Sequence, residues 1–566
     1  MQPAVYPIEV GGQIMRKLGL FLLFCAFVPA AHAGCTASGT VLTAASPSES
    51  DVQACLTAAT STTTQINIPA GSASWTTPIS WTVPTGNNNL TIQGATECTP
   101  NGTPGTSGYS VTCVDNTSIT DGVTSGSTAQ FFAIGGINST TLFRITGITF
   151  TTGRLQYNGF IGTNGQSPNF RFDHNHIVLT TDQGGLSMVR VSGCLNGVAD
   201  HNLLVMPNGS GSDNGIQEYN GQSCYSDSLG LGDQVWAHAT SLGAANFFFM
   251  ESNQIINGAS NDCLFGGRFV IRYNSISNTP NAPPIQTHAT TGGRQRGCRA
   301  WEIYDNYIIN TSATEAFETL RLESGTGVVW GNTVPRGPEG TEIFLSFHSE
   351  RSGNYTYGED ATSSGWGYCG TNFNGTGSNW DANLSTADGH ECLDNVGMGI
   401  GDLLIGGFTS DESGSNNVTN SATGCTSSQT CAWPRQALEP VHEWLDTVTV
   451  AGGGSYWSVT NPSTTALANN REFYVWCDAS SSSGCTTFNG TAGTGSGLLS
   501  ARPSSCTANV GYWATDAQSL YTCNSGGNAW TASYTPYTYP HPLTSGSSNP
   551  TSGTPTAPAN LTATVD

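Results

Sequence analysis

A short pattern of alternating apolar residues that ends in asparagine recurs along the middle of this chain. The copies are FRFDHNHI (170–177), GVADHNLL (197–204), FFMESNQI (248–255), FVIRYNSI (269–276), WEIYDNYI (301–308) and GVVWGNTV (327–334). A weaker copy, LFRITGIT (142–149), places Gly147 where the others have asparagine. Repeats at intervals of roughly 20–50 residues are typical of chains that stack one coil on the next. The pattern therefore favours a β-solenoid.

The distance of each residue from the asparagine predicts which way its side chain faces. Residues three and five positions before the asparagine share one face of a strand. We expect them to form the interior of the stack: Phe170, Phe172, Ala199, Phe248, Met250, Phe269, Ile271, Trp301, Ile303 and Val329. The asparagine amides are expected to bond from coil to coil as a ladder, formed by Asn175, Asn202, Asn253, Asn274, Asn306 and Asn332. A flat sandwich offers no reason for each strand to end in asparagine.

Stacked short strands with an asparagine ladder resemble the right-handed parallel β-helix of the pectate-lyase-like superfamily. The resemblance covers roughly residues 40–450 at the level of pattern. It implies an all-β fold built on a right-handed parallel β-helix. It does not specify a substrate, because many chemistries occur on this solenoid.

The ends of the chain differ from the repeat region. Residues 1–33 have the basic, apolar and small-residue parts of a secretory signal peptide, with Met15 as an alternative start. A helix at 46–59 begins with helix-start residues and is expected to form an N-terminal cap over the open core. The β-helix itself is predicted to span 34–470.

The later segments are predicted from composition. A long loop insertion is expected at 346–440, after which HEWLDTVTV (442–450) returns to the repeat with Asp446 in the asparagine position. The remaining predictions are a disulfide-rich C-terminal cap at 471–545, a linker at 546–557 and the start of a truncated fibronectin type III-like module at 558–566.

Charge and cysteine content predict the compartment and exclude some partners. The net charge is −22 and the only lysine is Lys17, which disfavours nucleic acid and anionic membranes as partners. Of 17 cysteines, loss of Cys25 with the leader leaves 16, an even number typical of exported proteins with disulfides. Nearest-neighbour pairing predicts Cys35/Cys55, Cys98/Cys113, Cys425/Cys431, Cys477/Cys485 and Cys506/Cys523.

These features predict a secreted bacterial protein with no membrane contact beyond export. A lipoprotein or another form of cell-surface attachment is the alternative, because Cys35 closely follows the leader. The oligomeric state is not constrained by the sequence.

The position two residues before each asparagine faces outward and is rich in charged and aromatic side chains. Its members are Asp173, Asp200, Glu251, Arg272, Tyr304 and Trp330. Coils about 4.8 Å apart would stack the three carboxylates, and their repulsion requires a cation, a shared proton or a ligand. We expect a Ca²⁺ site formed by Asp173, Asp200 and Glu251. The alternative is a solvated face whose side chains splay apart.

A second candidate feature is a local excess of arginine. Arg268, Arg272, Arg294, Arg296 and Arg299 lie close together in the sequence, near Asp262, His288 and Glu302. Guanidinium groups suit the carboxylate of a uronic acid, although such arginines can instead tie down backbone carbonyls. The predicted catalytic residues are Arg272, Glu302, His288 and Glu251; the predicted substrate-binding residues are Asp262, Arg268, Arg294, Arg296, Arg299 and Tyr304.

The resemblance implies two chemistries. Lyases of this superfamily pair calcium-binding acidic residues with an arginine or lysine base, a role that Arg272 matches in type. Hydrolase members use carboxylate pairs, with a short separation on adjacent coils and a longer one on alternate coils. We therefore expect a polysaccharide lyase that cleaves a uronate-containing polysaccharide by β-elimination. The alternatives are a glycoside hydrolase with a carboxylate pair and a non-catalytic carbohydrate-binding or surface solenoid.

Overall fold

The computed structural model describes most of the chain after the leader. The described residues are 34–124, 126–156, 158–207, 213–221, 224, 233–236, 238–278, 283–288, 297–311, 316–335, 341–348, 395–399, 437–460, 467–477 and 487–545. They all belong to the second of the two units into which the chain divides, His32–Asp566. Within them, no helix has the length and apolar character needed to cross a membrane.

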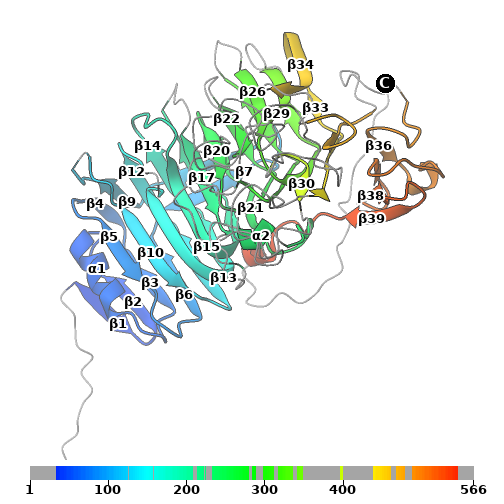
Figure 1. Ribbon diagram of the computed structural model, residues 1–566. Helices are drawn as coiled ribbons and strands as arrows, with labels where there is room; N and C mark the ends of the chain where they lie inside the picture. Colours follow the sequence, from blue (N-terminus) through cyan, green and yellow to red (C-terminus); the bar gives the residue numbers. More distant parts are fainter. Residues whose placement is uncertain are drawn as a thin grey trace, which may run out of the picture. The chain divides into compact units, whose positions relative to one another are not determined.

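The N-terminal helix is present where the sequence predicts one. Helix α1 (Glu49–Ala58) begins after Ser48, whose side chain accepts a hydrogen bond from the backbone N–H of Asp51. Its buried face packs against β2 (Val41–Ala44), and the Cys35–Cys55 disulfide joins it to β1 (Cys35–Ser38). Figure 1 shows this helix at the blue end of the strands.

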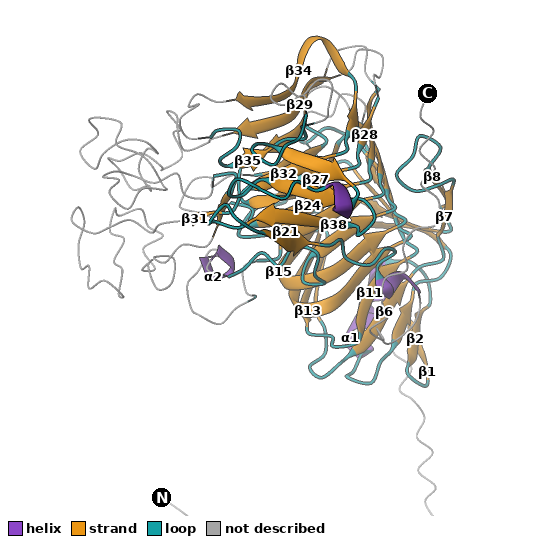
Figure 2. Ribbon diagram, turned by 90° about the vertical axis from the view of Figure 1, so that its right-hand side faces the viewer, coloured by secondary structure: helices purple, strands orange, loops and turns teal. Residues whose placement is uncertain are grey.

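Most of the described strands are parallel, and each pairs with strands of the preceding and following repeats, an arrangement compatible with a β-helix (Figures 1 and 2). The first sheet contains the strands that precede the ladder asparagines. In order, it consists of β3 (Gln65–Asn67), β6 (Asn89–Gln93), β11 (Leu142–Thr146), the ends of β13 (Ile161–Asp173) and β15 (Ser187–Asp200), β18 (Phe248–Glu251), β21 (Arg268–Arg272), β24 (Ala300–Tyr304), β27 (Thr326–Trp330), β32 (Val441–Trp444) and β35 (Phe473–Tyr474).

The second sheet contains the strands that follow the asparagines. Its members are β4 (Gly71–Trp75), β9 (Thr117–Asp121), β12 (Thr149–Thr152), β14 (His176–Leu179), β16 (Leu203–Val205), β19 (Gln254–Ile256), β22 (Ser275–Asn278), β25 (Tyr307–Asn310), β28 (Thr333–Val334) and β33 (Thr447–Val448). The pairing of β33 with β28 confirms that the repeat returns after residue 440.

The third sheet contains the strands that come before those of the first sheet within each repeat. It consists of β5 (Ile79–Thr82), β10 (Phe132–Ile137), the first halves of β13 and β15, β17 (Asn214–Tyr219), β20 (Ala259–Cys263), β23 (Ile285–Thr287), β26 (Ala316–Leu322), β29 (Thr341–His348) and β34 (Val450–Thr460). Strands β20 and β23 are joined by hydrogen bonds such as that from Ser260 N to Pro284 O at 2.7 Å.

The asparagine ladder is confirmed. Each Asn side-chain oxygen accepts hydrogen bonds from the backbone and side-chain N–H groups of the preceding ladder residue, from Asn202 below Asn175 to Asn332 below Asn306. Asp446 closes the series, because its Oδ1 accepts from Asn332 N at 2.6 Å and from Asn332 Nδ2 at 2.8 Å. The predicted interior residues all lie in one buried apolar cluster.

The alignment of the weakest repeat, LFRITGIT (142–149), with the others is wrong by one residue in the sequence-based prediction. Thr146 pairs with Asp173, so Gly147 corresponds to His174 and Ile148 takes the ladder position. The residue before the ladder position has a left-handed backbone in both repeats, with φ of 69° at Gly147 and 52° at His174. Glycine adopts this conformation without a steric cost, which explains its presence there.

The C-terminal residues cover the outward face of the first sheet. They form a four-stranded sheet of β36 (Thr494–Gly497), β37 (Gly511–Ala514), β38 (Ser519–Cys523) and β39 (Trp530–Tyr534). Trp513, Leu520 and Tyr534 pack in one apolar cluster with Trp330 and Trp444 of the first sheet. Figure 2 shows β38 in front of β24 and β27. This segment therefore closes a lateral face of the stack.

Smaller elements and disulfides complete the described structure. β7 (Glu97–Asn101) and β8 (Ser110–Val114) form a hairpin, and β30 (Met398–Gly399) pairs with β31 (Ala437–Leu438). Three predicted disulfides are confirmed, and two more join sequence-distant cysteines: Cys35–Cys55, Cys98–Cys113, Cys506–Cys523, Cys194–Cys224 and Cys263–Cys298. Cys477 is disulfide-bonded, whereas Cys425, Cys431 and Cys485 lie outside the described residues.

Candidate functional site

The outward column predicted from the repeat is present in register. Strand pairing places the six residues in consecutive coils of the first sheet, in the order Asp173, Asp200, Glu251, Arg272, Tyr304 and Trp330. Their side chains are buried, however, and none of the six is more than 8% exposed. A solvated face is therefore also excluded for these positions.

Each carboxylate of the column is compensated by a guanidinium group of the protein itself. Arg171 binds Asp200 through two hydrogen bonds of 2.9 and 2.8 Å. Arg272 donates two hydrogen bonds, of 2.8 and 2.5 Å, to the single oxygen Oε2 of Glu251. Arg144 pairs with Asp173, whose pKa lies below its ordinary value because this pairing and a bond to His174 outweigh burial. The predicted Ca²⁺ site does not fit these residues, since their oxygens already face arginines.

Residues 537–541 of the C-terminal segment, which follow β39, lie over the middle of the column. Arg272 donates hydrogen bonds to the backbone oxygens of Tyr537 at 2.7 Å and Thr538 at 2.9 Å. Glu251 accepts one from the backbone N–H of His541 at 2.7 Å. The outward column is therefore not open to solvent at Glu251 and Arg272, because the chain covers it. The catalytic roles of Arg272 and Glu251 and the binding role of Tyr304 stay predictions that this arrangement does not favour.

Glu302 is buried beneath the same segment. It accepts hydrogen bonds from the backbone N–H of Gly243 at 2.6 Å and the hydroxyl of Tyr534 at 2.9 Å. Burial raises its pKa to about 7, more than these bonds lower it. Its predicted catalytic role therefore also lacks solvent access.

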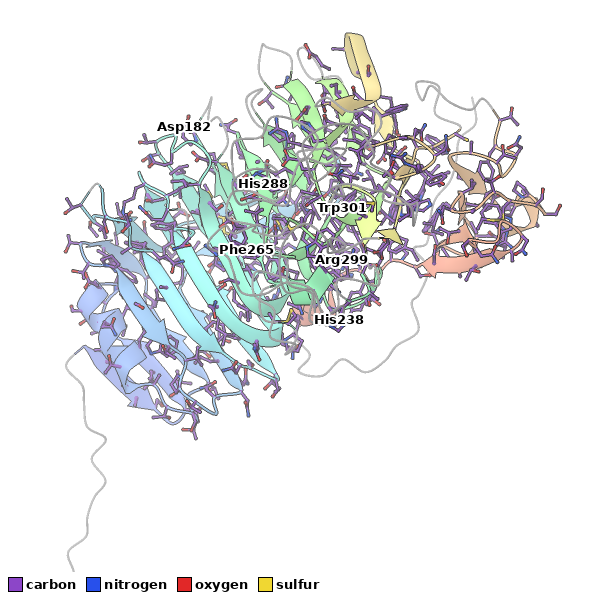
Figure 3. The ribbon with its side chains drawn as sticks, viewed as in Figure 1. Asp182, His238, Phe265, His288, Arg299 and Trp301 are labelled. Atoms are coloured by element: carbon purple, nitrogen blue, oxygen red, sulfur yellow. A yellow bond between two sulfur atoms is a disulfide. The ribbon has the colours of Figure 1, made fainter. Side chains whose placement is uncertain are left out.

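The arginine cluster is largely structural. Arg268 donates to the backbone oxygens of Thr240 at 3.1 Å and Ala239 at 2.8 Å. Arg299 donates to His238 O at 3.1 Å and to Glu439 Oε2 at 2.7 Å, and Figure 3 labels both Arg299 and His238. These contacts match the alternative that the arginines tie down carbonyls. Arg294 and Arg296 lie outside the described residues.

Asp262 and His288 occupy a different face, the outward side of the third sheet. Strand pairing connects one outward column across six coils, in the order Ser80, Ala133, Gly162, Arg190, Gln217 and Asp262. His288, labelled in Figure 3, follows β23 and brings its Nδ1 atom to 3.2 Å from Oδ1 of Asp262. This column runs from a groove to a cluster of acids and histidines.

The groove lies over the first four coils of the third sheet. It has a volume of about 330 Å³ and is lined on its outward side by Ser80, Thr82, Gln130, Ala133, Gly135, Asn158, Gly162, Asn164, Arg190 and Ser192. The central column of its floor carries alanine and glycine, and the side chain of Gln130 lies directly over Gly162. The guanidinium of Arg190 stacks over the ring of Tyr219, 4.0 Å from its centroid, where the groove meets the next coil.

The cluster beyond the groove joins carboxylates from alternate coils through a histidine. His288 lies between Asp262 and Glu323, with its Nε2 atom 3.9 Å from Oε2 of Glu323. Gln217 Nε2 donates to Oδ2 of Asp262 at 2.8 Å. Burial raises the pKa of Asp262, but the bonds from His288 and Gln217 outweigh it and leave the pKa below its ordinary value. A third of the His288 side chain is exposed, whereas the Asp262 and Glu323 side chains are 9% and 6% exposed, so the imidazole is the most accessible of the three groups.

The network continues into the next two strands. Arg321 Nε lies 2.6 Å from Glu318 and 3.7 Å from Glu323, and His348 Nε2 lies 2.8 Å from Glu318. Burial raises the pKa of Glu318, but bonding to His348 and the charge of Arg321 outweigh burial and lower this pKa to about 2. Asp262 and Glu318, the two acids of this face whose pKa is lowered, are therefore held ionised beside histidine and arginine.

The sequence identified Asp262 and His288 from composition but missed Arg190, Gln217 and Glu323. The third-sheet strands are separated from the ladder asparagines by loops of variable length, so no fixed spacing links them. The alternation of Val189, Arg190 and Val191 was an available signal for an outward arginine.

Comparison with known proteins adds no relative to this description. No protein-family model matches the chain, and no significant match was found among curated proteins or solved structures.

Proposed function

We propose that this chain is an exported, carbohydrate-active protein that binds a polysaccharide along its third sheet and hydrolyses it. The fold that we infer is a right-handed parallel β-helix of the pectate-lyase-like kind. The observation that carries the proposal is the single outward column that leads from the groove through Arg190 and Gln217 to Asp262. A chain of sugars lying along the stack would pass from binding groups to an acid–histidine cluster.

The lining of the groove favours a mostly neutral glycan. Apart from Arg190, its outward side chains are small or neutral hydrogen-bonding groups such as Thr82, Asn164 and Ser192, which suit sugar hydroxyls. A net charge of −22 would also repel a densely charged polyuronate. Both observations favour hydrolysis of a neutral chain over elimination from an acidic one.

The carboxylate pair in this proposal is Asp262 and Glu323. Asp262 lies on β20 and Glu323 directly follows β26, with β23 between these two strands. Two strand spacings amount to roughly 10 Å, close to the separation of about 6.5–9.5 Å in inverting glycosidases. Asp262 is ionised at neutral pH because its pKa is lowered, which suits the base.

The reaction then follows from these positions. Asp262 takes a proton from a water molecule whose oxygen attacks the anomeric carbon, while Glu323 gives its proton to the leaving oxygen as the glycosidic bond breaks. His288, whose ring nitrogens lie 3.2 Å from Asp262 and 3.9 Å from Glu323, holds the two acids in place.

A lyase is the second candidate because of Arg190. Its guanidinium lies in the groove over Tyr219, where it could bind the carboxylate of a single uronate unit. In that reaction a base beside the bound sugar would remove the proton next to the carboxylate, a carbon–carbon double bond would form, and the glycosidic oxygen would leave with a proton from an acid.

The test is a polysaccharide panel with two readouts. New reducing ends without ultraviolet absorbance from an unsaturated uronate support the hydrolase, and the absorbance supports the lyase. Asp262→Asn and Glu323→Gln should each lose at least about a hundredfold in kcat. Asp115→Asn is the matched control, because Asp115 pairs with His176 at 2.8 Å away from the groove. Activity that survives both the Asp262→Asn and the Glu323→Gln substitutions contradicts the site, and binding without cleavage favours a non-catalytic module.

A further inference from the structure

Two histidines stack at the turns between the first and second sheets. His174 and His201 each precede a ladder asparagine and have φ values of 52° and 54°. Because Asp173 pairs with Asp200 and His176 pairs with Leu203, these two turns lie in adjacent coils. The rings are nearly parallel, with centroids 5.0 Å apart and planes inclined by 25°. The ladder thus holds two imidazoles side by side.

Each imidazole is oriented by the carboxylate of the preceding residue. His174 Nδ1 lies 2.6 Å from Asp173, and His201 Nδ1 lies 2.7 Å from Asp200. Those carboxylates are fully buried and are themselves held by Arg144 and Arg171. Histidines that bind metals commonly donate the other ring N–H to a carboxylate in this way, which fixes the tautomer and increases ligand basicity.

We propose that His174 and His201 form a binding site for a divalent transition-metal ion, with Asp200 as the neighbouring acidic group. Ligand atoms of these three residues lie within 4.8 Å of one another. With Nδ1 of each ring bonded to its aspartate, Nε2 is the atom that faces the ion. To bind one ion, the two rings, now 5.0 Å apart and inclined by 25°, must tilt toward each other until each nitrogen lies ~2.0–2.1 Å from it.

The ion class follows from the ligands. Imidazole nitrogen suits Zn²⁺, Ni²⁺ and Cu²⁺, and affinity is greatest for Cu²⁺ in this series. The side chains of His174 and His201 are 32% and 24% exposed, so an ion can enter and water can complete its coordination. The ion joins the turn after β13 to the turn after β15, so its expected effect is on stability, independent of glycan cleavage.

The test uses tag-free protein with Zn²⁺ or Cu²⁺ alone. One ion should bind per chain, the melting temperature should rise, and Cu²⁺ should give an electron paramagnetic resonance spectrum with coupling to two imidazole nitrogens. His174→Asn and His201→Asn should each weaken binding at least tenfold; asparagine is chosen because it tolerates the left-handed backbone. His176→Asn, next to the site but paired with Asp115, should bind like the parent.

Two results overturn the proposal. One is equal binding by the parent and the His174→Asn/His201→Asn double variant, with metal-free melting temperatures showing that both are folded. The other is a Cu²⁺ spectrum of the unaltered protein that shows no imidazole coupling. This second result overturns the proposal even if the variants do not fold.

Discussion

A buried carboxylate in this molecule is stable only where a guanidinium, a hydrogen-bond donor or a retained proton accompanies it. Arg171 lies two residues before Asp173 on the same strand face, and it binds Asp200 of the next coil. The repulsion between stacked acids indicated from the sequence that compensation was needed. Two of the compensating arginines, Arg144 and Arg171, could have been found by reading the position two residues earlier in their repeats.

The Arg272–Glu251 pair gives a prediction at this scale. Burial disfavours the charge of Arg272, but Glu251 and Tyr304 outweigh it and hold its pKa above the ordinary value. Arg272→Met leaves Glu251 buried without its partner, so we expect a loss of roughly 3–5 kcal/mol in urea denaturation. The double variant Arg272→Met/Glu251→Leu should recover most of it. Normal stability with complete loss of activity in Arg272→Met would instead restore this column as the active site.

Asp446 provides a second prediction, because it stands at an asparagine position of the ladder. Burial and then the charge of the nearby Glu443 raise its pKa well above the ordinary value, so folding favours its protonated form. Asp446→Asn preserves the acceptor for Asn332 without needing that proton. We expect a gain of about 1–2 kcal/mol at pH 8 and little change at pH 4, measured by urea denaturation. Asn332→Asp is the matched control and should lose stability at pH 8 only.

At the scale of elements, local repetition decided what could be predicted. The ladder strands carry their interior and outward residues at fixed distances from an asparagine, so the first sheet and its register followed from the sequence. The third sheet has no such marker, so the sequence did not predict the groove or the role of Glu323 in the cluster beyond it. The docking of residues 534–543 on the first sheet depends on contacts more than 200 residues apart in sequence, such as Tyr534 with Glu302, and composition alone does not reveal them.

The C-terminal segment gives the prediction at this scale. Trp513 stacks on Trp330, and Tyr537 and His541 contact Phe249, within one apolar cluster that also contains Leu520 and Tyr534. A chain that stops after residue 486 should therefore expose this face, bind an apolar dye and aggregate. A chain that stops after residue 545 is the control and should behave like the full chain. Equal solubility and dye binding of the two shortened chains would show that the segment is not needed to cover the first sheet.

For the whole molecule, burial sets the pH range of stability. Acids whose pKa is raised by burial favour the protonated folded state: Glu218, Glu302, Asp305, Glu443 and Asp446. Acids whose pKa is lowered by cationic or hydrogen-bonding partners favour the ionised folded state: Asp173, Asp262 and Glu318. The first group of acids lowers the stability of the fold as the pH rises through the upper acidic range. The second group lowers it as the pH falls through the lower acidic range.

The melting temperature should consequently peak at about pH 4–5. Above this range, unfolded carboxyls ionise near their ordinary values of 3.8–4.5 while Glu302 and Asp305 hold protons up to about 7, so stability falls as the pH rises toward 7. Below it, protonation of Glu318, whose folded pKa is about 2, removes stability as the pH falls. Glu302→Gln should reduce the decline between pH 5 and 7 by roughly 2–3 kcal/mol. A melting temperature that rises steadily from pH 5 to 8 would mean that these buried acids are ionised in the folded protein.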